Sequence, residues 1–460
     1  MNLTKHFFLT SISAILLGLS MPRAGPNVGA LEWISLIPWF IALREAPPRT
    51  RFFLSLWMGI LFWAITVYWL YLVTALGFFA FLPYLGLYFA VFGLAMGYVF
   101  KRKYLPYLAG PLLWIFLEFL RGRLLGGFPW LNLAHGQYLN IPLLPWSSLG
   151  GEGLISGLII LVNLLILEMV LARGRRRIIF AAILFFVIAG VYSGGLILLN
   201  RLPSTSLRIA VIQPNITLEK WDKNSQAESF YVLLSLGYES LKDKPNLIIW
   251  PETSFSYDLE EEKTCLEQLK KLSRENNCFL LVGSVKELPG GKFYNRAILF
   301  APSGEIDFYD KVRLVPFGEY VPLGERWPWW ERWIEKIAGY KPSCIPGKEL
   351  KTLRLDSIPF GVLICFEDIF PGISRTFKKK GAKFLVNMTD DHWYGHTSAP
   401  YQHLAASVFR AAENRLPVIR SANTGISCFI DAHGRITNVV KDKKGTAIFI
   451  RGYNVGEICP

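Results

Sequence analysis

The chain has 460 residues, of which 52% are hydrophobic, 15% aromatic and only 18% charged. That charged fraction lies well below the roughly 25% usual for soluble globular proteins, which argues against a purely cytosolic enzyme. The charge is also uneven, because residues 1–200 hold 14 of the 49 Lys and Arg residues but only 5 of the 35 acidic residues. We interpret the net charge of +14 as an excess of basic residues flanking a membrane, and expect no nucleic-acid partner.

Residues 1–200 contain several long apolar runs. A helix needs about 20 apolar residues to cross a bilayer. Candidate runs lie near residues 7–20, 31–43, 53–75, 78–100, 104–120, 153–172 and 178–199. They predict a transmembrane helical domain over residues 1–200 with about seven spans. A cleaved signal peptide is the competing interpretation of the first run.

Basic residues between the runs set the expected topology. With Lys5, most of them cluster in every second connection: Arg44, Arg49, Arg51, Lys101, Arg102, Lys103, Arg173, Arg175, Arg176 and Arg177. The positive-inside rule places these connections in the cytoplasm. An inside N-terminus followed by seven crossings would then put residues 201–460 on the outer, periplasmic face of a bacterial inner membrane.

Two features of the membrane part have open interpretations. The stretch of residues 122–148 is too rich in Gly and Pro to be a span, and it is either a lid or lipid-contacting arm or an ordinary connection. Glu118, Glu152 and Glu168 lie in or near apolar runs, where charge is costly and often marks function. We interpret them as span-end residues that reach the interface and leave them out of the candidate site.

From residue 207 onward, short apolar runs alternate with polar, helix-like stretches. The runs predict strands near residues 207–212, 246–250, 279–285, 294–300, 359–365, 383–387 and 417–420. Apolar positions three and four apart predict helices over residues 225–242, 259–276 and 402–414. The pattern is typical of one α/β domain over residues 201–460.

Three of the predicted strands are followed by chemically useful side chains. Glu252 follows Trp250-Pro251, Lys311 follows Tyr309-Asp310, and Cys365 ends an apolar run. Taken singly, each has an ordinary structural explanation, as a helix cap, a surface charge or a small core residue. Together they suggest a site, because a thiol becomes a good nucleophile beside a base or a positive charge.

The motifs around these residues resemble a known family. Residues 250–253 (Trp-Pro-Glu-Thr), 309–320 (Tyr-Asp-Lys-Val-Arg-Leu-Val-Pro-Phe-Gly-Glu-Tyr) and 364–368 (Ile-Cys-Phe-Glu-Asp) are similar to the Glu, Lys and Cys motifs of the nitrilase superfamily. With a membrane part before them, they resemble bacterial apolipoprotein N-acyltransferases, and so do residues 213–215, 294–295 and 420–425. The resemblance implies an αββα sandwich after the membrane helices. Phe366 stands where some relatives have Tyr, and the printed sequence lacks the further membrane helix that members typically carry.

The resemblance also implies a reaction. A fatty acyl chain would pass from a phospholipid to the α-amine of the diacylglyceryl-cysteine of an apolipoprotein, through a thioester on Cys365. Glu252 would be the general base and Lys311 would stabilise the oxyanion. By motif position, Glu319, Glu367 and Asn295 would support them, and Trp221 would belong to a substrate-gating loop. We expect a monomer in the membrane, with no cofactor and no metal.

Three other functions remain open from the residues alone. A membrane-tethered nitrilase-type amidase would hydrolyse small amides without lipid. A Cys-His hydrolase would use His392, His396 or His403, and a non-enzymatic transporter or scaffold would never form a covalent acyl adduct. A metal site at His392 and His396 is disfavoured, since no Glu follows the first His as it does in His-Glu-x-x-His helices.

Overall fold

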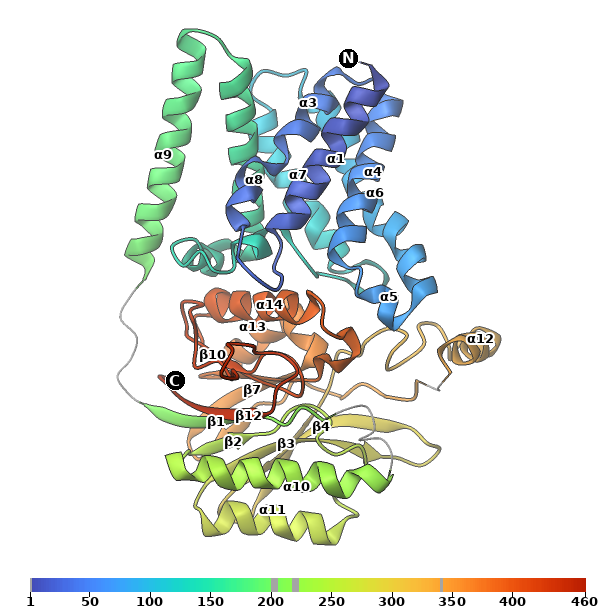
Figure 1. Ribbon diagram of the computed structural model, residues 1–460, viewed down its shortest axis with the longest axis vertical. Helices are drawn as coiled ribbons and strands as arrows, with labels where there is room; N and C mark the ends of the chain where they lie inside the picture. Colours follow the sequence, from blue (N-terminus) through green and yellow to red (C-terminus); the bar gives the residue numbers. More distant parts are fainter. Residues whose placement is uncertain (1, 200–205, 217–222, 340–341) are drawn as a thin grey trace. The chain divides into compact units, whose positions relative to one another are not determined.

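The computed structural model of the protein describes residues 2–199, 206–216, 223–339 and 342–460 (Figure 1). The chain forms two compact units, one of residues 1–200 with 397–413 and one of residues 201–396 with 414–460. Most of helix α14 (Ala399–Asn414) therefore packs with the first unit, which we call the helical unit. The expected domain limits, 1–200 and 201–460, differ from this division at residues 397–413 and stay a prediction.

The helical unit consists largely of long apolar helices. Its helices are α1 (Leu3–Ser20), α2 (Glu32–Ser35), α3 (Ile37–Glu45), α4 (Pro48–Thr66), α5 (Leu70–Val73), α6 (Ala75–Val99), α7 (Pro106–Arg121), α8 (Ser147–Leu171) and α9 (Arg175–Leu198). Among the described residues, four segments are long and apolar enough to cross a membrane: Leu3–Ser20, Ala75–Val99, Leu144–Leu171 and Arg175–Leu198. A membrane part with several apolar helices is thus confirmed, whereas the number of about seven crossings stays a prediction.

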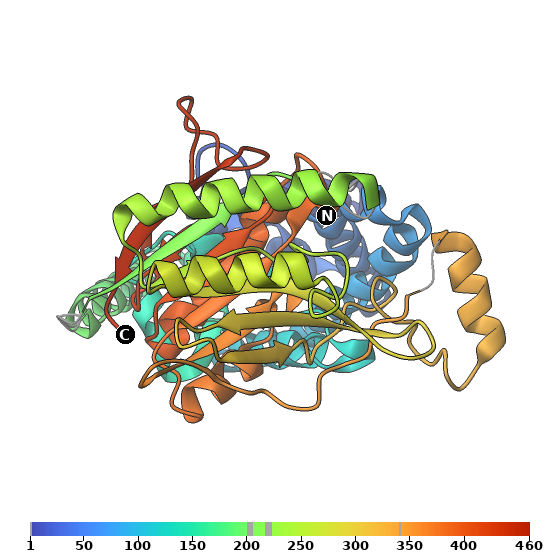
Figure 2. The same ribbon diagram turned by 90° about the horizontal axis from the view of Figure 1, so that it is seen from below.

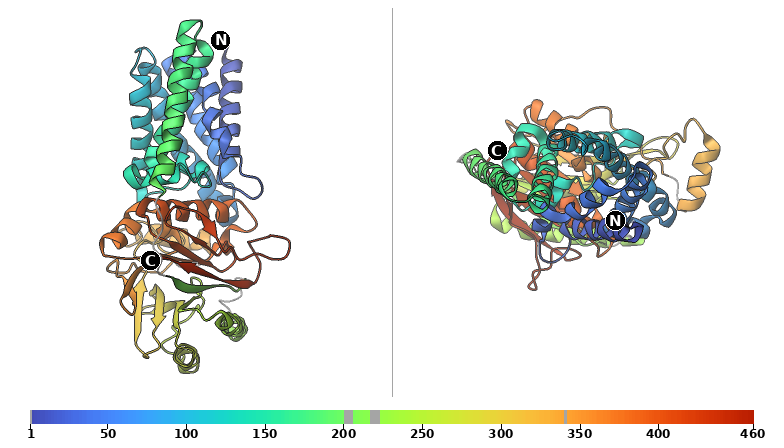
Figure 3. Two further views of the ribbon diagram at one scale, coloured as in Figure 1. Left: turned by 90° about the vertical axis from the view of Figure 1, so that its left-hand side faces the viewer. Right: turned by 90° about the horizontal axis from the view of Figure 1, so that it is seen from above.

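Small residues allow two of these helices to pack closely. A Cβ atom added to Gly59 of α4 would lie 2.7 Å from the Cα of Gly86 in α6, so only glycine fits at this contact. Such small residues are the usual means of close helix packing in a membrane. Helix α9 packs alongside α8 (Figure 3). It is much more exposed than α8, because only 6% of its most apolar segment is buried, compared with 61% for Leu144–Leu171. Its apolar side chains face outward, as lipid contact requires.

The Gly- and Pro-rich stretch of residues 122–148 forms short turns instead of a span. It contains the 3₁₀ turns η2 (Leu124–Gly126), η3 (Leu133–Gln137) and η4 (Leu144–Trp146). Trp130 and Leu133 are each 2% exposed. The stretch is therefore largely packed into the helical unit.

The three acidic residues singled out in the apolar runs, Glu118, Glu152 and Glu168, are buried inside the helical unit. Glu118 accepts hydrogen bonds at Oε1 from Trp114 Nε1 (2.9 Å) and from the backbone N–H of Leu133 (2.8 Å). Glu152 is 5% exposed. The expectation that Glu118 and Glu152 reach the membrane interface is wrong, because both side chains are buried and accept hydrogen bonds from protein groups. Glu168 is also 5% exposed and forms ion pairs with Arg44 and Arg176.

Glu152 is the centre of a buried polar cluster. It accepts a hydrogen bond from Asn132 Nδ2 (2.6 Å), contacts His135 Nε2 (3.0 Å) and pairs with Arg410 Nη2 (2.8 Å). Arg410 also pairs with Glu413 (3.1 Å). The cluster, defined as Asn132, His135, Glu152, Arg410 and Glu413, ties α14 to α8 and to the turn η3. We refer to it below as the Glu152 cluster.

The second unit contains two six-stranded sheets, as an αββα sandwich requires. The first has the order β12-β1-β2-β3-β4-β5 and the second β11-β10-β9-β8-β7-β6. The strands are β1 (Leu207–Gln213), β2 (Leu247–Ile249), β3 (Phe279–Glu287), β4 (Phe293–Phe300), β5 (Ile306–Asp310), β6 (Leu353–Leu355), β7 (Ile358–Ile364), β8 (Leu385–Thr389), β9 (Val418–Ala422), β10 (Cys428–Ile430), β11 (Ile436–Thr437) and β12 (Gly452–Ile458).

Helices cover the first sheet, and the two sheets contact each other. Helices α10 (Lys223–Ser240) and α11 (Lys263–Glu275) cover the first sheet, where Leu233 and Leu272 are fully buried in a core shared with the strands (Figure 2). Helix α13 (Pro371–Lys379) packs against β7, and α12 (Pro328–Ala338) follows β5 along the chain. Between the sheets, the Ser421 hydroxyl donates to the carbonyl oxygens of Ile212 and Ile249, each at 3.0 Å.

The central strands of both sheets are parallel, which positions the candidate site. Strands β1, β2 and β3 run parallel to one another, as do β7, β8 and β9. Parallel strands end at the same edge of a sheet, where functional side chains of α/β proteins usually gather. Glu252 follows β2 and Cys365 follows β7 directly.

Candidate active site

Glu252 is held in place by three hydrogen-bond donors. Its Oε1 accepts from Asn295 Nδ2 (2.8 Å) and from Lys311 Nζ (3.2 Å), and its Oε2 accepts from the backbone N–H of Asp390 (3.0 Å). The side chain is 7% exposed. Gly283 on β3 permits this arrangement, because a Cβ atom there would lie 2.8 Å from the Glu252 Cα and 2.4 Å from the carbonyl oxygen of Pro251.

Lys311 lies between two carboxylates. Its Nζ is 3.2 Å from Glu252 Oε1 and 2.8 Å from Glu319 Oε1, and the side chain is 1% exposed. Burial alone would lower the pKa of this ammonium, but the charges of Glu319 and Glu252 outweigh burial and raise its pKa well above the ordinary value. Lys311 is therefore a fixed positive charge at any physiological pH.

Glu319 and Asn295 complete the arrangement around Lys311. Glu319 Oε2 accepts the backbone N–H of Val315 (2.7 Å), and its Oε1 also accepts from Asn295 Nδ2 (3.2 Å). The Asn295 side-chain amide thus joins Glu252 to Glu319, while the backbone carbonyl oxygen of Asn295 accepts the backbone N–H of Lys311 (2.9 Å). Glu252, Asn295, Lys311 and Glu319 form one connected network.

Cys365 lies within the electrostatic reach of this network. Burial, with the charges of Glu252 and Asp391, raises the pKa of the Cys365 thiol well above its ordinary value, against the opposite effects of Lys311 and of a hydrogen bond from Thr389. Its backbone φ is +52°, a left-handed conformation that costs roughly 1–2 kcal/mol for a residue with a Cβ atom. Such backbone conformations are often found at functional sites. The thiol is thus protonated at rest and needs a base to become a nucleophile.

Glu367 anchors the turn that follows Cys365, the 3₁₀ turn η7 (Cys365–Ile369). Its carboxylate accepts the backbone N–H groups of Val312, Arg313 and Ile364 at 2.7, 3.0 and 2.9 Å. It also accepts from the Tyr309 hydroxyl at 2.9 Å. Burial raises the pKa of Glu367 to about 7. Glu367 therefore joins the Lys311 segment to the Cys365 turn by backbone contacts.

The sequence did not single out several further groups near the thiol. Burial and the charges of Cys365, Asp391 and Glu252 raise the pKa of the Tyr394 hydroxyl well above its ordinary value, which places this phenol beside the network. Tyr394 and Asp391 belong to the 3₁₀ turn η8 (Asp391–Tyr394), directly after the Asp390 N–H that binds Glu252. The position of this loop directly after β8 could have pointed to it, but its residues match no motif closely enough to assign them roles.

The remaining candidates from the sequence are Trp221 and three histidines. Trp221 is outside the described residues. The ring of His396 stacks on Phe449 at 4.0 Å, and that of His392 lies 5.8 Å from the same phenylalanine. His403 belongs to the helical unit, where its ring lies 5.5 Å from that of Trp130. The charges that act on the Cys365 thiol are instead those of Glu252, Lys311 and Asp391.

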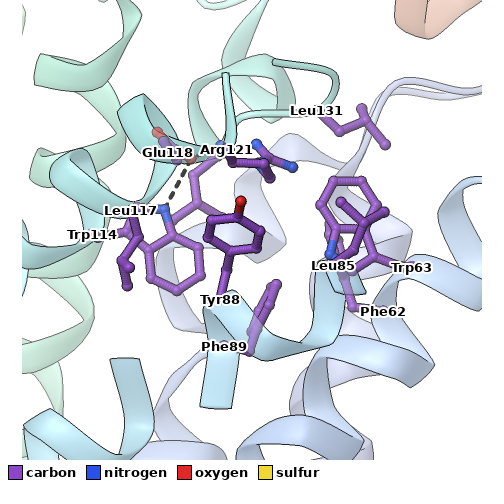
Figure 4. A pocket seen from close by; sticks show the side chains of 11 residues that line it. Phe62, Trp63, Leu85, Tyr88, Phe89, Trp114, Leu117, Glu118, Arg121 and Leu131 are labelled. Atoms are coloured by element: carbon purple, nitrogen blue, oxygen red, sulfur yellow. Dashed lines mark hydrogen bonds between the residues drawn. The ribbon is translucent and has the colours of Figure 1, made fainter. Parts of the chain in front are cut away.

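A separate pocket lies in the helical unit (Figure 4). Within it the Arg121 guanidinium lies 4.7 Å from the ring centre of Trp63, and Trp114 donates to Glu118. The pocket is lined by Phe62, Trp63, Leu85, Tyr88, Phe89, Trp114, Leu117, Glu118, Arg121, Leu131 and Leu133. All these residues belong to the helical unit, so the pocket is distinct from the network around Cys365.

Two known families match successive parts of the chain. Residues 208–450 match the family described as carbon-nitrogen hydrolase, and residues 13–165 match the one described as apolipoprotein N-acyltransferase N-terminal domain. The second unit is thus a nitrilase-fold domain of the carbon-nitrogen hydrolase class. A solved structure of Nit3 from Saccharomyces cerevisiae, a member of branch 10 of the nitrilase superfamily, aligns at 17% identity and a TM-score of 0.42, covering 57% of this chain and 93% of that one.

Relatives that align with nearly the whole chain identify the family within this class. An apolipoprotein N-acyltransferase of Geobacter metallireducens is 32% identical over 94% of this chain and 86% of its own length. Another, from Chlorobaculum tepidum, is 31% identical over 94% of this chain and 88% of its own length. The chain belongs to the apolipoprotein N-acyltransferase family.

Proposed function

We propose that this protein is an acyltransferase that moves a fatty acyl chain from a phospholipid to the N-terminal α-amine of a diacylglyceryl-modified cysteine of an apolipoprotein, the last step of lipoprotein maturation. The observation that carries the proposal is the buried pair of Glu252 and Lys311, 3.2 Å apart, whose charges act on the Cys365 thiol. Family membership supports the overall reaction, and the geometry supports the assignment of Cys365 as the acyl carrier. The family favours this reaction over hydrolysis of an amide.

In the first half-reaction the thiol attacks the donor ester. Because the Cys365 thiol is protonated at rest, attack requires transfer of its proton to a base. Glu252 takes this proton while the sulfur forms a bond to the ester carbonyl carbon. The C–O bond of the ester then breaks, and the departing glycerol oxygen receives the proton from Glu252. The products are a lysophospholipid and a thioester on Cys365.

Negative charge develops on the carbonyl oxygen during the attack. Lys311 supplies a permanent positive charge, since Glu252 and Glu319 keep it protonated. Together with a backbone N–H near Cys365, it would stabilise the oxyanion. A prearranged charge of this kind needs no reorganisation during the reaction and is often the largest catalytic contribution. Glu319 and Asn295 would hold the ammonium and the base at a constant separation.

In the second half-reaction the thioester meets an amine. The neutral α-amine of the apolipoprotein attacks the thioester carbonyl and gives up a proton to Glu252. The C–S bond breaks, the sulfur recovers the proton, and an amide remains on the acceptor. The enzyme returns to its starting state after two separate substrates, which is a ping-pong sequence.

A membrane part suits an enzyme whose two proposed substrates are both anchored in a bilayer. Donor and acceptor are each anchored in a bilayer, so an enzyme held by apolar helices meets them at the membrane surface. The proposal therefore includes a monomer that crosses the inner membrane of a bacterium several times, with its catalytic domain on the outer face. Residues 126–138 and the segment Trp327–Trp333 were both expected to form the lipid entry. The segment Trp327–Trp333 is the better candidate, because its Trp327, Trp329 and Trp333 are exposed whereas residues 126–138 are largely buried.

A transfer assay tests the proposed function. Purified protein in detergent micelles is given a phospholipid with a labelled acyl chain and a synthetic peptide that begins with diacylglyceryl-cysteine. Label should appear on the free amine of the peptide, in step with lysophospholipid, and an N-acetylated peptide should receive none. Release of free fatty acid without transfer, or rapid hydrolysis of small amides without lipid, would instead favour the amidase.

A further inference from the structure

A fully buried ionic network lies behind the nucleophile in the second sheet. Its centre is Arg420 on β9, whose side chain is 0% exposed. Its Nη1 donates to Asn387 Oδ1 (2.8 Å) and to Asp368 Oδ2 (3.0 Å), and its Nη2 lies 3.4 Å from Asp391 Oδ2. Its Nε donates to the carbonyl oxygen of Ile426 (3.3 Å). One guanidinium therefore connects β8, η7 and η8.

Asn387 links Arg420 to Cys365 by hydrogen bonds. While its Oδ1 is fixed by Arg420, its Nδ2 donates to the carbonyl oxygens of Leu363 (3.3 Å) and Cys365 (3.2 Å). The amide thus holds the peptide group that follows Cys365, the residue whose φ is +52°. A conformation of this kind persists only where the surrounding contacts hold it.

Arg420 also balances charge beside the thiol. Asp368 and Asp391 are both completely buried, and an unpaired buried carboxylate is very costly. The groups that act electrostatically on Cys365 include Glu252 and Lys311 from the first sheet, Thr389 from β8, and Asp391 and Tyr394 from η8. Of these, the Asp391 charge is the one that lies next to Arg420. Without the guanidinium, this negative charge would act on the thiol uncompensated.

We infer that Arg420 is a positioning residue for the nucleophile: through Asn387 it fixes the Cys365 turn, and through Asp391 it compensates the negative charge beside the sulfur. This inference rests on the proposed role of Cys365. It assigns two separable effects, a geometric one carried by Asn387 and an electrostatic one carried by Asp391. Arg420→Lys would keep the charge but lose the geometry, because one ammonium cannot replace a planar guanidinium that spans three side chains.

Alkylation of Cys365 across a pH series tests the inference without any acyl transfer. The purified full-length protein is treated with iodoacetamide, and modification of the Cys365 peptide is followed by mass spectrometry. In Arg420→Met the midpoint of the rate against pH should rise, because the buried Asp391 charge, which lies 3.4 Å from the guanidinium, is no longer compensated. In the double variant Arg420→Met with Asp391→Asn, the midpoint should return toward that of the unmodified protein.

Two more variants separate geometry from charge and guard against misfolding. Asn387→Ser and Arg420→Lys should lower the plateau rate of alkylation several-fold while moving the midpoint little. The matched control is Arg208→Gln, an exposed arginine of β1 paired with Glu457, which should change neither quantity. The inference would be overturned if folded Arg420→Met protein showed an unchanged dependence of alkylation rate on pH. It would also be overturned if Asn387→Ser and Arg420→Lys kept the plateau rate of alkylation of the unmodified protein. Because the readout is thiol reactivity, failure of acyl transfer would leave this result interpretable.

Discussion

Each unit of the protein buries a carboxylate against a cation and an asparagine. In the helical unit, Glu152 meets Arg410 and Asn132, and in the α/β unit, Glu252 meets Lys311 and Asn295. The two carboxylates are almost equally buried, at 5% and 7% exposed. The difference lies in the neighbours, because the Glu252 network faces the thiol of Cys365, whereas the Glu152 cluster joins a helix to a turn. A buried ion pair therefore does not identify a catalytic site without a reactive group beside it.

Replacing the two carboxylates gives the largest contrast. Glu252→Gln keeps the size of the side chain but removes the base, so transfer should fall by about 10³-fold, within the usual range for general-base catalysis. Glu152→Gln should lower the thermal unfolding midpoint, because Arg410 loses part of its compensation, while the rate per folded molecule changes little. Transfer rates and unfolding midpoints measured on both variants check this. Equal losses of rate would remove the distinction between the two clusters.

Replacing the two cations, Lys311 and Arg410, should give the same contrast as replacing the carboxylates: loss of activity in one case and loss of stability in the other. Lys311→Met should lower the rate of thioester formation by about 10²–10³-fold, as loss of an oxyanion donor typically does. Arg410→Met, in the Glu152 cluster, should mainly reduce the yield of folded protein. Single-turnover reaction with labelled phospholipid measures the acylation step directly. A Lys311→Met protein that is acylated at the normal rate would contradict the proposed role of the ammonium.

Glu367 provides a test through pH. Its folded-state pKa of about 7 lies above the value of an unfolded glutamate, so the folded state binds the proton more tightly between these two values. The contribution of Glu367 to the free energy of unfolding should therefore decrease as pH rises toward 7 and stay level above it. At 1.36 kcal/mol per unit, the change is about 3 kcal/mol. Unfolding of the protein and of Glu367→Gln at several pH values measures this slope, which should be absent in the variant; equal slopes would contradict the assignment.

The matched asparagines should give the smallest difference. Asn295→Ala removes the amide that joins Glu252 to Glu319, and a hydrogen bond to a charged group is worth about 1.5–3 kcal/mol, so a loss of activity on the order of tenfold is expected. Asn132→Ala removes the corresponding bond to Glu152 and should affect stability alone. Parallel measurements of kcat and of the unfolding midpoint distinguish the two. A larger loss of kcat in Asn132→Ala would reverse the comparison.

The sequence predicted most of the α/β fold. All seven predicted strands and all three predicted helices form close to their expected limits. Strand β12 (Gly452–Ile458) was missed, because its sequence lacks a run of β-branched or apolar residues and it is fixed by antiparallel pairing with β1. Strand β5 (Ile306–Asp310) was expected only as an apolar run before Lys311, because two aspartates interrupt it and its limits depend on pairing with β4. The short strands β6, β10 and β11 were also missed. Long-range pairing of this kind cannot be read from local pattern.

The chemistry of Glu252, Lys311 and Cys365 suggested a site, but the roles of these residues and of their supporting neighbours came from the resemblance to a family. Spacing alone could not reveal that Asn295 joins Glu252 to Glu319, or that a backbone N–H of Asp390 binds Glu252. Arg420 was noted as part of a motif, but its contacts with three other segments depend on the folded sheet. In the membrane part, composition could not separate a carboxylate that reaches an interface from one, such as Glu152, that is satisfied by buried partners.

The most direct test of the account is the mass of the peptide that contains Cys365 after the purified protein has met phospholipid in the absence of an acceptor. The account predicts an added fatty acyl mass on Cys365 that hydroxylamine removes, that disappears when the acceptor peptide is supplied, and that does not form in Glu252→Gln. An acyl adduct on another residue, or efficient transfer by Cys365→Ala, would contradict it.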